Sequence, residues 1–287
     1  MKSNKEHDLR LPEWLRNKPC RGVHNTKRLL RSFGISTVCE EARCPSIGEC
    51  FSRPTAAFMI LGDRCTRNCG FCSVASSAPF PPDPQEPEKV AIAAKALGLR
   101  YVVITSVTRD DLDDGGAGHF AATVSSVRNH LPQAKVEILT PDFRGNFRSL
   151  EVVIHSKPDV FNHNVETVPR LYPSVRPLAD YAGSLRILEY VKKTSPGIYT
   201  KSGLMLGLGE EIKEVIRVLK DIRDAGCDLV TIGQYLRPLK SKLPVAAYIH
   251  PDIFESLRIT ALSLGFRHVA SAPRVRSSMN AEEMYYN

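Results

Sequence analysis

The sequence predicts an α/β fold in which most strands are parallel. Six short apolar runs rich in β-branched residues recur along the chain, and each is followed by a stretch with the apolar spacing of a helix. Strands that alternate with helices are joined by right-handed crossovers and lie parallel to one another. This alternation is typical of an open doubly wound sheet or of a full or partial barrel, and periodicity does not choose between them.

The predicted elements follow one another at regular intervals. Strands are expected at residues 57–61, 101–106, 136–139, 160–164, 203–208 and 229–235, and helices at 88–97, 118–131, 147–155, 184–193, 211–225 and 252–264. The proline-rich run 79–87 predicts an extended connector, because proline fixes φ and lacks an N–H donor. Residues 12–50 mix glycine, proline and charge around one short helix at 26–33, which predicts an irregular N-terminal segment.

Composition limits the class of protein. With 287 residues and 43% hydrophobic content, the chain can bury one large core. The charged start lacks the apolar core of a signal peptide, and the apolar run 56–61 is far shorter than the roughly 18 residues of a membrane span. We therefore expect a cytoplasmic protein without membrane contact. The net charge of +8 suits an anionic cofactor, a nucleic acid or an acidic protein, although the spread of basic residues favours a solvated surface.

The cysteines are unevenly distributed. Six of the eight lie between Cys39 and Cys72, and only Cys20 and Cys227 lie elsewhere. Their density is far below that of a small disulfide-stapled domain, and a cytoplasmic compartment keeps thiols reduced. Clustered cysteines in such a protein indicate a metal site or catalysis.

The first triad, Cys65, Cys69 and Cys72, has the spacing C-x3-C-x2-C directly after the first predicted strand. A cubane [4Fe-4S] cluster held by three thiolates keeps one iron open for chemistry. Gly70 allows a tight turn around such a cluster, and Phe71 offers it a flat apolar face. A zinc site is the alternative, but structural zinc takes four closed ligands.

The second triad, Cys39, Cys44 and Cys50, has the spacing C-x4-C-x5-C in the N-terminal segment. A second set of three thiols predicts a second cluster with a separate task. The alternatives are a disulfide with a spare thiol, or zinc.

These motifs resemble those of two nested families. The first triad, with an aromatic residue before its last cysteine, is similar to the signature of the radical S-adenosylmethionine (SAM) superfamily, in which the open iron chelates SAM. The two triads together, in this order and at this separation, resemble the lipoyl synthase family. The similarity covers nearly the whole chain and includes segments 12–16, 105–107, 109–112, 114–117, 162–167, 201–205, 207–210 and 233–238.

The resemblance implies a partial (β/α)6 TIM-type barrel with N-terminal and C-terminal extensions. Residues 1–52 would carry the second triad, residues 53–250 would form the barrel, and residues 251–287 would form a helix and tail that close it. The implied cofactors are SAM and two [4Fe-4S] clusters. The implied reaction inserts two sulfur atoms at C6 and C8 of a protein-bound octanoyl-lysine to give lipoyl-lysine. A 5'-deoxyadenosyl radical abstracts each hydrogen, and the second cluster donates the sulfur.

The resemblance also implies roles for individual residues. Ser278 of the Arg276-Ser277-Ser278 motif would be the fourth ligand of the second cluster, with Ser277 as the alternative. An oxygen ligand binds iron less tightly than a thiolate does, so its release could free an iron as the cluster is dismantled. The implied cofactor contacts are Phe71 beside the first cluster, Thr105 and Ser106 at the methionyl end of SAM, Asn164 and Glu166 near its ribose, Lys201 at its carboxylate, and Gln234 and Leu236 on its adenine side.

Some positions depart from the family pattern. Met279 and Asn280 follow the serines where Tyr-His is usual, and Ala272 stands where glycine is usual. These changes concern substrate docking and leave both triads intact.

The implied partners are proteins rather than nucleic acids or membranes. They are octanoylated lipoyl carrier domains, namely acyltransferase subunits of dehydrogenase complexes and the glycine cleavage carrier protein. An electron donor such as ferredoxin or flavodoxin and an iron-sulfur carrier that rebuilds the second cluster are also implied.

Two other functions are compatible with two cysteine triads. A radical SAM methylthiotransferase acting on RNA also adds sulfur, but it needs a larger N-terminal domain and an RNA-binding module that do not fit in 287 residues. The alternative from a different class is a zinc or iron-sulfur binding module without catalysis, such as an electron carrier. In iron and sulfide analysis, roughly eight irons per chain would support two cubanes, whereas zinc without iron would exclude the enzyme.

Overall fold

The computed structural model describes residues 10–16, 23–52 and 55–286. Its main sheet has eight strands in the order β1-β2-β5-β6-β7-β8-β9-β10. All neighbouring strands from β2 to β10 pair in parallel, whereas β1 is antiparallel to β2. The strands are β1 (Ser36–Thr37), β2 (Ala57–Ile60), β5 (Tyr101–Ser106), β6 (Lys135–Leu139), β7 (Val160–Asn162), β8 (Tyr199–Leu206), β9 (Leu229–Gln234) and β10 (His268–Ser271).

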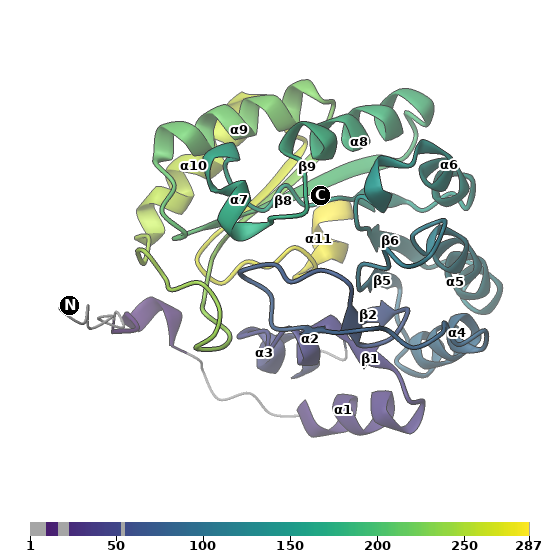
Figure 1. Ribbon diagram of the computed structural model, residues 1–287. Helices are drawn as coiled ribbons and strands as arrows, with labels where there is room; N and C mark the ends of the chain where they lie inside the picture. The colour runs from purple at the N-terminus through teal and green to yellow at the C-terminus, as the bar shows by residue number, and fades with distance from the viewer. Residues whose placement is uncertain (1–9, 17–22, 53–54, 287) are drawn as a thin grey trace.

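Helices alternate with these strands and surround them (Figure 1). The helices between strands are α4 (Glu86–Ala96), α5 (Ala117–His130), α6 (Phe147–His155), α8 (Tyr181–Thr194), α9 (Ile212–Asp224) and α10 (Pro251–Ser263). The other helices are α1 (Val23–Ser32), α2 (Val38–Glu41), α3 (Ile47–Ser52), α7 (Tyr172–Val175) and α11 (Ala281–Tyr286), with 3-10 turns η1 (Glu13–Leu15), η2 (Phe143–Gly145) and η3 (Pro169–Leu171). A separate two-stranded sheet joins β3 (Arg64–Cys65) to β4 (Ala75–Ser76).

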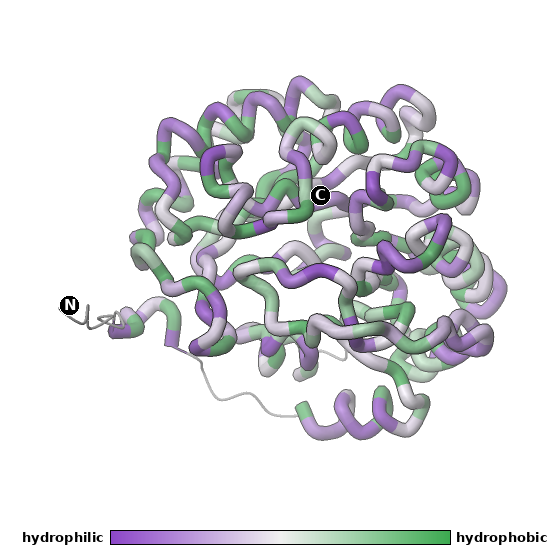
Figure 2. Tube along the Cα trace, in the orientation of Figure 1, coloured by the Kyte–Doolittle hydropathy of each residue, from purple (hydrophilic) through white to green (hydrophobic). Residues whose placement is uncertain are grey.

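The apolar pattern explains why these segments adopt their structures. Strand β2 is buried at all four positions, as expected of a parallel strand covered on both faces. Helix α9 buries Val215, Val218, Leu219 and Ile222, which recur on one face, and a capping box fixes its start. Figure 2 shows hydrophobic and hydrophilic residues alternating along the outer helices. One face of each helix therefore packs on the sheet while the other meets solvent.

The predicted α/β class with a partial barrel is confirmed, and each of the six predicted strands overlaps an observed one. The sheet also contains β1 and β10, which were not predicted. Strand β10 has the half-polar sequence His-Val-Ala-Ser and lies at the edge of the sheet, so it lacks the apolar run that marks the inner strands. Among the described residues, no helix has the length and apolar character needed to cross a membrane.

The C-terminal segment lies inside the ring of helices. Helix α11 contacts β5 and β10 and appears near the middle of Figure 1. Ala281 and Met284 are buried in the core, and the ring of Tyr285 lies 5.9 Å from that of Tyr101 and 5.6 Å from that of Tyr199. Tyr101 and Tyr199 are the first residues of β5 and β8, so α11 packs at the amino ends of these strands.

Candidate active site

A cavity of about 560 Å³ joins the N-terminal segment, the strand ends and the C-terminal segment. This volume lies in the usual range for small-molecule sites. Residues predicted to bind clusters or SAM make up much of its wall, namely Cys39, Cys44, Cys50, Phe71, Cys72, Asn164, Glu166, Gln234, Leu236, Ser277 and Ser278. The structure thus brings together parts of both triads and of the Arg-Ser-Ser motif around one space.

The loop that carries the first triad is held by backbone contacts. The Cys65 Sγ accepts hydrogen bonds from the N–H groups of Arg67 at 3.4 Å and Thr108 at 3.3 Å. Gly70 donates its N–H to the carbonyl of Val175 at 2.9 Å. A Cβ at Gly70 would lie 2.7 Å from the Ser174 carbonyl oxygen, so this turn has no space for a side chain. These contacts hold the loop in place.

The thiols in each triad are close enough to affect one another. The pKa of Cys72 is raised to about 11, chiefly by burial, with contributions from Cys69 and Cys65. Burial raises the pKa of Cys39 to about 12, and Cys44 and Cys50 add to the rise. A bound metal centre reverses this effect because its positive charge stabilises thiolates. Among the described cysteines none forms a disulfide, so these soft donors are available to iron.

The triads do not form a site for a single ion. Within the described part of the chain, no three Cys, His, Asp or Glu side chains are arranged to hold one metal ion. The ligands of a [4Fe-4S] cluster bind different irons and therefore lie farther apart than the ligands of a single ion. Thiols that interact without converging on one point are compatible with such clusters.

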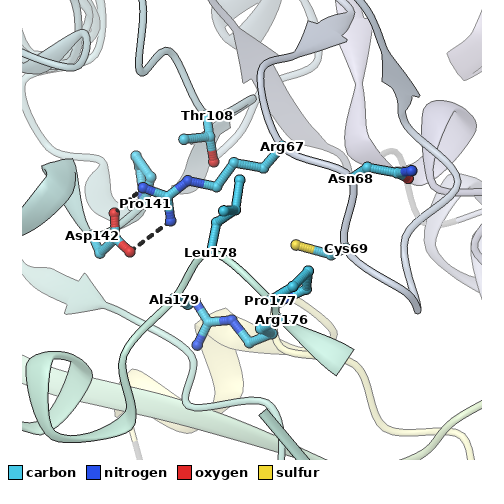
Figure 3. A pocket seen from close by; sticks show the side chains of 10 residues that line it. All are labelled: Arg67, Asn68, Cys69, Thr108, Pro141, Asp142, Arg176, Pro177, Leu178 and Ala179. Atoms are coloured by element: carbon cyan, nitrogen blue, oxygen red, sulfur yellow. Dashed lines mark hydrogen bonds and ion pairs between the residues drawn. The ribbon is translucent and has the colours of Figure 1, made fainter. Parts of the chain in front are cut away.

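Arg67, between the first two cysteines of the first triad, is clamped by two carboxylates, of which Figure 3 shows that of Asp142. Its guanidinium binds Asp142 through two contacts of 2.6 and 2.7 Å and Asp110 through two contacts of 2.7 and 2.9 Å. Burial raises the pKa of Asp142, but the hydrogen bonds and charge of Arg67 outweigh this and lower it overall. The clamp ties the loop of the first triad to the loops that follow β5 and β6.

We predict that Arg67→Met lowers the free energy of unfolding by about 3 kcal/mol, because it leaves two partly buried carboxylates without their cation. Denaturant unfolding measures this loss. Arg144→Met is the control, since exposed Arg144 lies beside the clamp and its side chain donates only to the Asp110 carbonyl. Equal losses in the two variants would contradict a specific role for the clamp.

Because the pKa of Asp142 is depressed, the stability it contributes is present above its ordinary pKa of 3.8 and disappears as the pH falls further.

The C-terminal segment reaches the second triad although it lies far along the chain. The Ser46 hydroxyl donates to the Arg274 carbonyl at 3.1 Å across 228 residues. Burial lowers the pKa of Arg276, and the nearby Cys44 opposes this effect. Gly233 permits the close approach of this segment, since a Cβ there would lie 2.2 Å from the Val275 carbonyl oxygen. The Arg-Ser-Ser motif is therefore positioned beside the second triad.

Three of the residues predicted to contact SAM do not line the cavity. Thr105 is buried and donates its hydroxyl to the Leu139 carbonyl at 2.9 Å. The Ser106 hydroxyl is buried without a hydrogen-bond partner among the described residues. The Lys201 ammonium is fully buried and lies 3.0 Å from a carboxylate oxygen of Glu137. A contact between Lys201 and the SAM carboxylate would require this ion pair to open.

The predicted ribose and adenine contacts lie in the cavity wall, and local bonds already fix two of them. Glu166 has a positive φ of 70°, which is uncommon for a residue with a side chain, and strain of this kind is found at functional sites. The Asn164 side-chain amide donates to the Glu166 carboxylate at 3.1 Å. The Gln234 amide nitrogen donates to the carbonyls of Leu206 and Ala247, and its oxygen accepts from the N–H of Ile249. The Gln234 side chain is thus fully engaged with the backbone.

His163, next to β7, is buried as a neutral side chain. Its Nδ1 donates to the Thr140 carbonyl at 3.0 Å, and its Nε2 lies 3.2 Å from the Ser184 hydroxyl. Burial, with a contribution from the charge of Arg176, lowers the pKa of His163 to about 4. Between its ordinary pKa of 6.5 and about 4, the unfolded chain therefore binds a proton that the folded chain does not.

We predict that the free energy of unfolding falls as the pH drops from 6.5 towards 4, by up to about 1.4 kcal/mol per pH unit from this residue. His163→Gln should flatten this dependence in denaturant unfolding of the cluster-free chain at pH 7, 6 and 5. The control is His250→Gln, because the His250 side chain is 58% exposed. A pH dependence equally steep in both variants would disprove the assignment.

Comparison with known proteins shows the family of this chain. A family model described as the radical SAM superfamily matches residues 59–222. Proteins named lipoyl synthase from Caldicellulosiruptor saccharolyticus and Methylococcus capsulatus are 56% and 55% identical to this chain, over 95% and 96% of its length and 96% and 86% of theirs. The chain belongs to the lipoyl synthase family. It is a radical SAM enzyme of the sulfur-inserting kind, in a superfamily that uses SAM and a [4Fe-4S] cluster.

Solved structures that are distant in sequence share the fold of this lipoyl synthase family member. Methylornithine synthase matches with a TM-score of 0.56 and 16% identity, over 92% of this chain and 86% of its own. Streptococcus suis SuiB bound to SAM matches with a TM-score of 0.58 and 12% identity, over 86% of this chain and 54% of its own. At these identities the likeness concerns the fold alone.

Several site residues of this lipoyl synthase family member were not predicted from the sequence. The sequence offers one signal for Arg67, which is its position between the predicted cluster ligands Cys65 and Cys69. Asp110 also lies in a segment that carries the family resemblance, whereas Asp142 follows a predicted strand without any motif. Which carboxylates meet Arg67 depends on strand order, which periodicity does not provide.

Proposed function

We propose that this protein inserts sulfur at C6 and C8 of an octanoyl chain carried on a lysine of a lipoyl carrier domain, giving lipoyl-lysine. The observation that supports this most directly is the shared cavity. Cysteines of both triads and the Arg-Ser-Ser motif contribute to its wall. A reaction that needs a radical source and a sulfur source on one substrate requires both to lie near the same carbon atoms.

The proposed division of labour follows the two triads. Cys65, Cys69 and Cys72 hold the cluster that binds SAM, and the N-terminal triad with Ser278 holds a second cluster that is the sulfur source. When bound, SAM and its cluster supply a carbon radical able to remove hydrogen from an unactivated C–H bond. The chain itself orients the substrate between the two triads and excludes water from the cavity.

The cavity wall suits an alkyl chain. Val103, Leu139, Leu204 and Val275 line it together with the polar groups near the strand ends. An octanoyl chain has no polar group with which to be oriented, so apolar contacts must fix which carbons face each triad. We propose that residues 1–52, 53–250 and 251–287 contribute the second triad, the barrel and the serine ligand respectively.

The proposed partners follow from the same chemistry. The substrate carriers are lipoyl domains of acyltransferase subunits and the glycine cleavage carrier protein. Ferredoxin or flavodoxin would supply electrons, and an iron-sulfur carrier would rebuild the second cluster. A net charge of +8 favours association with acidic proteins. A cytoplasmic setting would keep the six triad thiols reduced.

The decisive experiment uses the full-length protein reconstituted without oxygen. It is incubated with SAM, a reductant and an octanoylated carrier peptide. The mass of the peptide is then determined by mass spectrometry, and 5'-deoxyadenosine is quantified. We expect about eight irons per chain and a peptide that has gained two sulfur atoms in place of two hydrogens. Cleavage of SAM without any gain of sulfur would reject the proposed substrate, and a reaction without SAM is the control.

A further inference from the structure

A buried ion pair lies in the interior of the barrel. Lys201 on β8 and Glu137 on β6 are fully buried, and the ammonium nitrogen lies 3.0 and 3.1 Å from the two carboxylate oxygens. Tyr101 on β5 donates its hydroxyl to the same carboxylate at 2.8 Å. Removal of both charges from water is costly, and a well-packed apolar pair would often be at least as stable. The pair is better explained by what it positions.

Asn162 on β7 connects this pair to the C-terminal segment. Its amide nitrogen donates to Glu137 at 2.9 Å and to the Ser277 hydroxyl at 2.8 Å, across 115 residues. A carboxylate paired with Lys201 accepts hydrogen bonds and does not donate them, so Asn162 must turn its NH₂ group towards it. The orientation of the Asn162 amide is therefore set by Glu137.

This orientation also determines the role of the Ser277 hydroxyl. Because Ser277 accepts from Asn162, its single proton is free to donate to the Asn164 side-chain oxygen, which lies 3.1 Å away. The Ser277 hydroxyl thus both accepts and donates a hydrogen bond inside the barrel. Both serines line the cavity, but Ser278 differs in that its side chain forms no hydrogen bond to another residue of the described chain.

We propose that Asn162, oriented by the Glu137–Lys201 pair, is a positioning residue that seats the Arg276-Ser277-Ser278 segment through Ser277. Ser277 is the anchor of the segment, and Ser278 is left to face the cavity. This gives Lys201 a structural task in place of a contact with SAM. The inference rests on the proposed function at one point only, namely that Ser278 is a ligand of the second cluster.

Hydrogen exchange on the reconstituted full-length protein tests the anchor directly. Ser277→Ala, Asn162→Ala and the double variant are compared at the backbone amides of residues 274–280. Each single variant should speed exchange there by about tenfold, because the segment opens more readily once its anchor is lost. The double variant should exchange no faster than the single ones, since Asn162 acts through Ser277.

The matched control is Ser271→Ala. Ser271 is a partly buried serine shortly before the same segment, and its hydroxyl donates to the Phe254 carbonyl at 2.7 Å, outside the network. Its exchange at residues 274–280 should match that of the unmodified protein. Variants that resemble this control, or a double variant whose effect is the product of the single effects, would overturn the inference. Since Ser277 is only partly buried, Ser277→Ala remains informative even if Asn162→Ala fails to fold.

The electron paramagnetic resonance spectrum of the reduced second cluster provides a further readout. The spectrum should change in both single variants if the segment no longer holds Ser278 in place, and it should be unaltered in Ser271→Ala. The unmodified protein separates the two proposals. If it gains no sulfur on the peptide, the proposed function fails, whereas the exchange result still decides whether Asn162 positions the segment.

Discussion

Cys69→Ala is expected to abolish the cleavage of SAM, with at least a roughly hundredfold loss of 5'-deoxyadenosine. The change removes one of three thiolates from a loop that is otherwise fixed by backbone contacts, and two protein ligands do not retain a cluster whose fourth iron must stay open. Iron should fall from about eight to about four per chain, because the second triad is untouched. Iron analysis and chromatography of the nucleoside product measure both effects.

Cys227→Ser is the control for this experiment. Cys227 is fully buried, and its Sγ contacts the carbonyls of Thr200 and Leu229 at 3.4 and 3.3 Å, contacts that a serine hydroxyl can replace. The control should retain its full iron content and SAM cleavage. An active Cys69→Ala protein with unchanged iron would show that the first triad does not hold the cluster that binds SAM.

Cys44→Ala is expected to separate the two halves of the reaction. Cys44 lies in the wall of the cavity beside Arg276. The variant should lose about four irons and all transfer of sulfur to the octanoyl peptide, while 5'-deoxyadenosine is still formed. Mass spectrometry of the peptide and quantification of the nucleoside, performed on one sample, give both values.

The contrast between the two cysteine variants is more informative than either alone. Cys69→Ala should stop the formation of both 5'-deoxyadenosine and the sulfur-bearing peptide. Cys44→Ala should stop only the formation of the sulfur-bearing peptide. Sulfur transfer that persists in Cys44→Ala would mean that the sulfur comes from elsewhere than the second triad. The same outcome would remove the reason for placing Ser278 at a cluster.

The inner strands are predicted from the sequence, and the two cysteine triads are recognised in it, because both have strong local signals. Buried parallel strands appear as continuous apolar runs, and the cysteines have fixed spacing. Strand β10 escaped prediction because half of its residues are polar and it lies at the edge of the sheet. Lys201 illustrates another limit, since its family position suggested an anionic ligand and nothing near it in the sequence indicates its ion pair with Glu137, 64 residues away.

The contacts among residues distant in sequence could not be predicted. Nothing near Arg67 indicates that two carboxylates from different loops will meet its guanidinium, and nothing near Ser277 indicates that Asn162 will bind it. These pairs exist because parallel strands place their carboxyl ends along one edge. Prediction of such pairs requires the order and register of the strands, which become known only once the chain has folded.

The bond between Ser46 and the Arg274 carbonyl has a consequence for biosynthesis. After Ser46 has been translated, a ribosome must add a further 228 residues before the receiving carbonyl exists. At ordinary elongation rates this delay is roughly 10 to 50 seconds. During that time the thiols of the N-terminal segment lack their C-terminal cover, so a nascent chain would be exposed to oxidation or to stray metal ions. Loading of the proposed second cluster would therefore be best timed after translation has passed Arg274, and a chain truncated before this point would lack the segment that covers the triad.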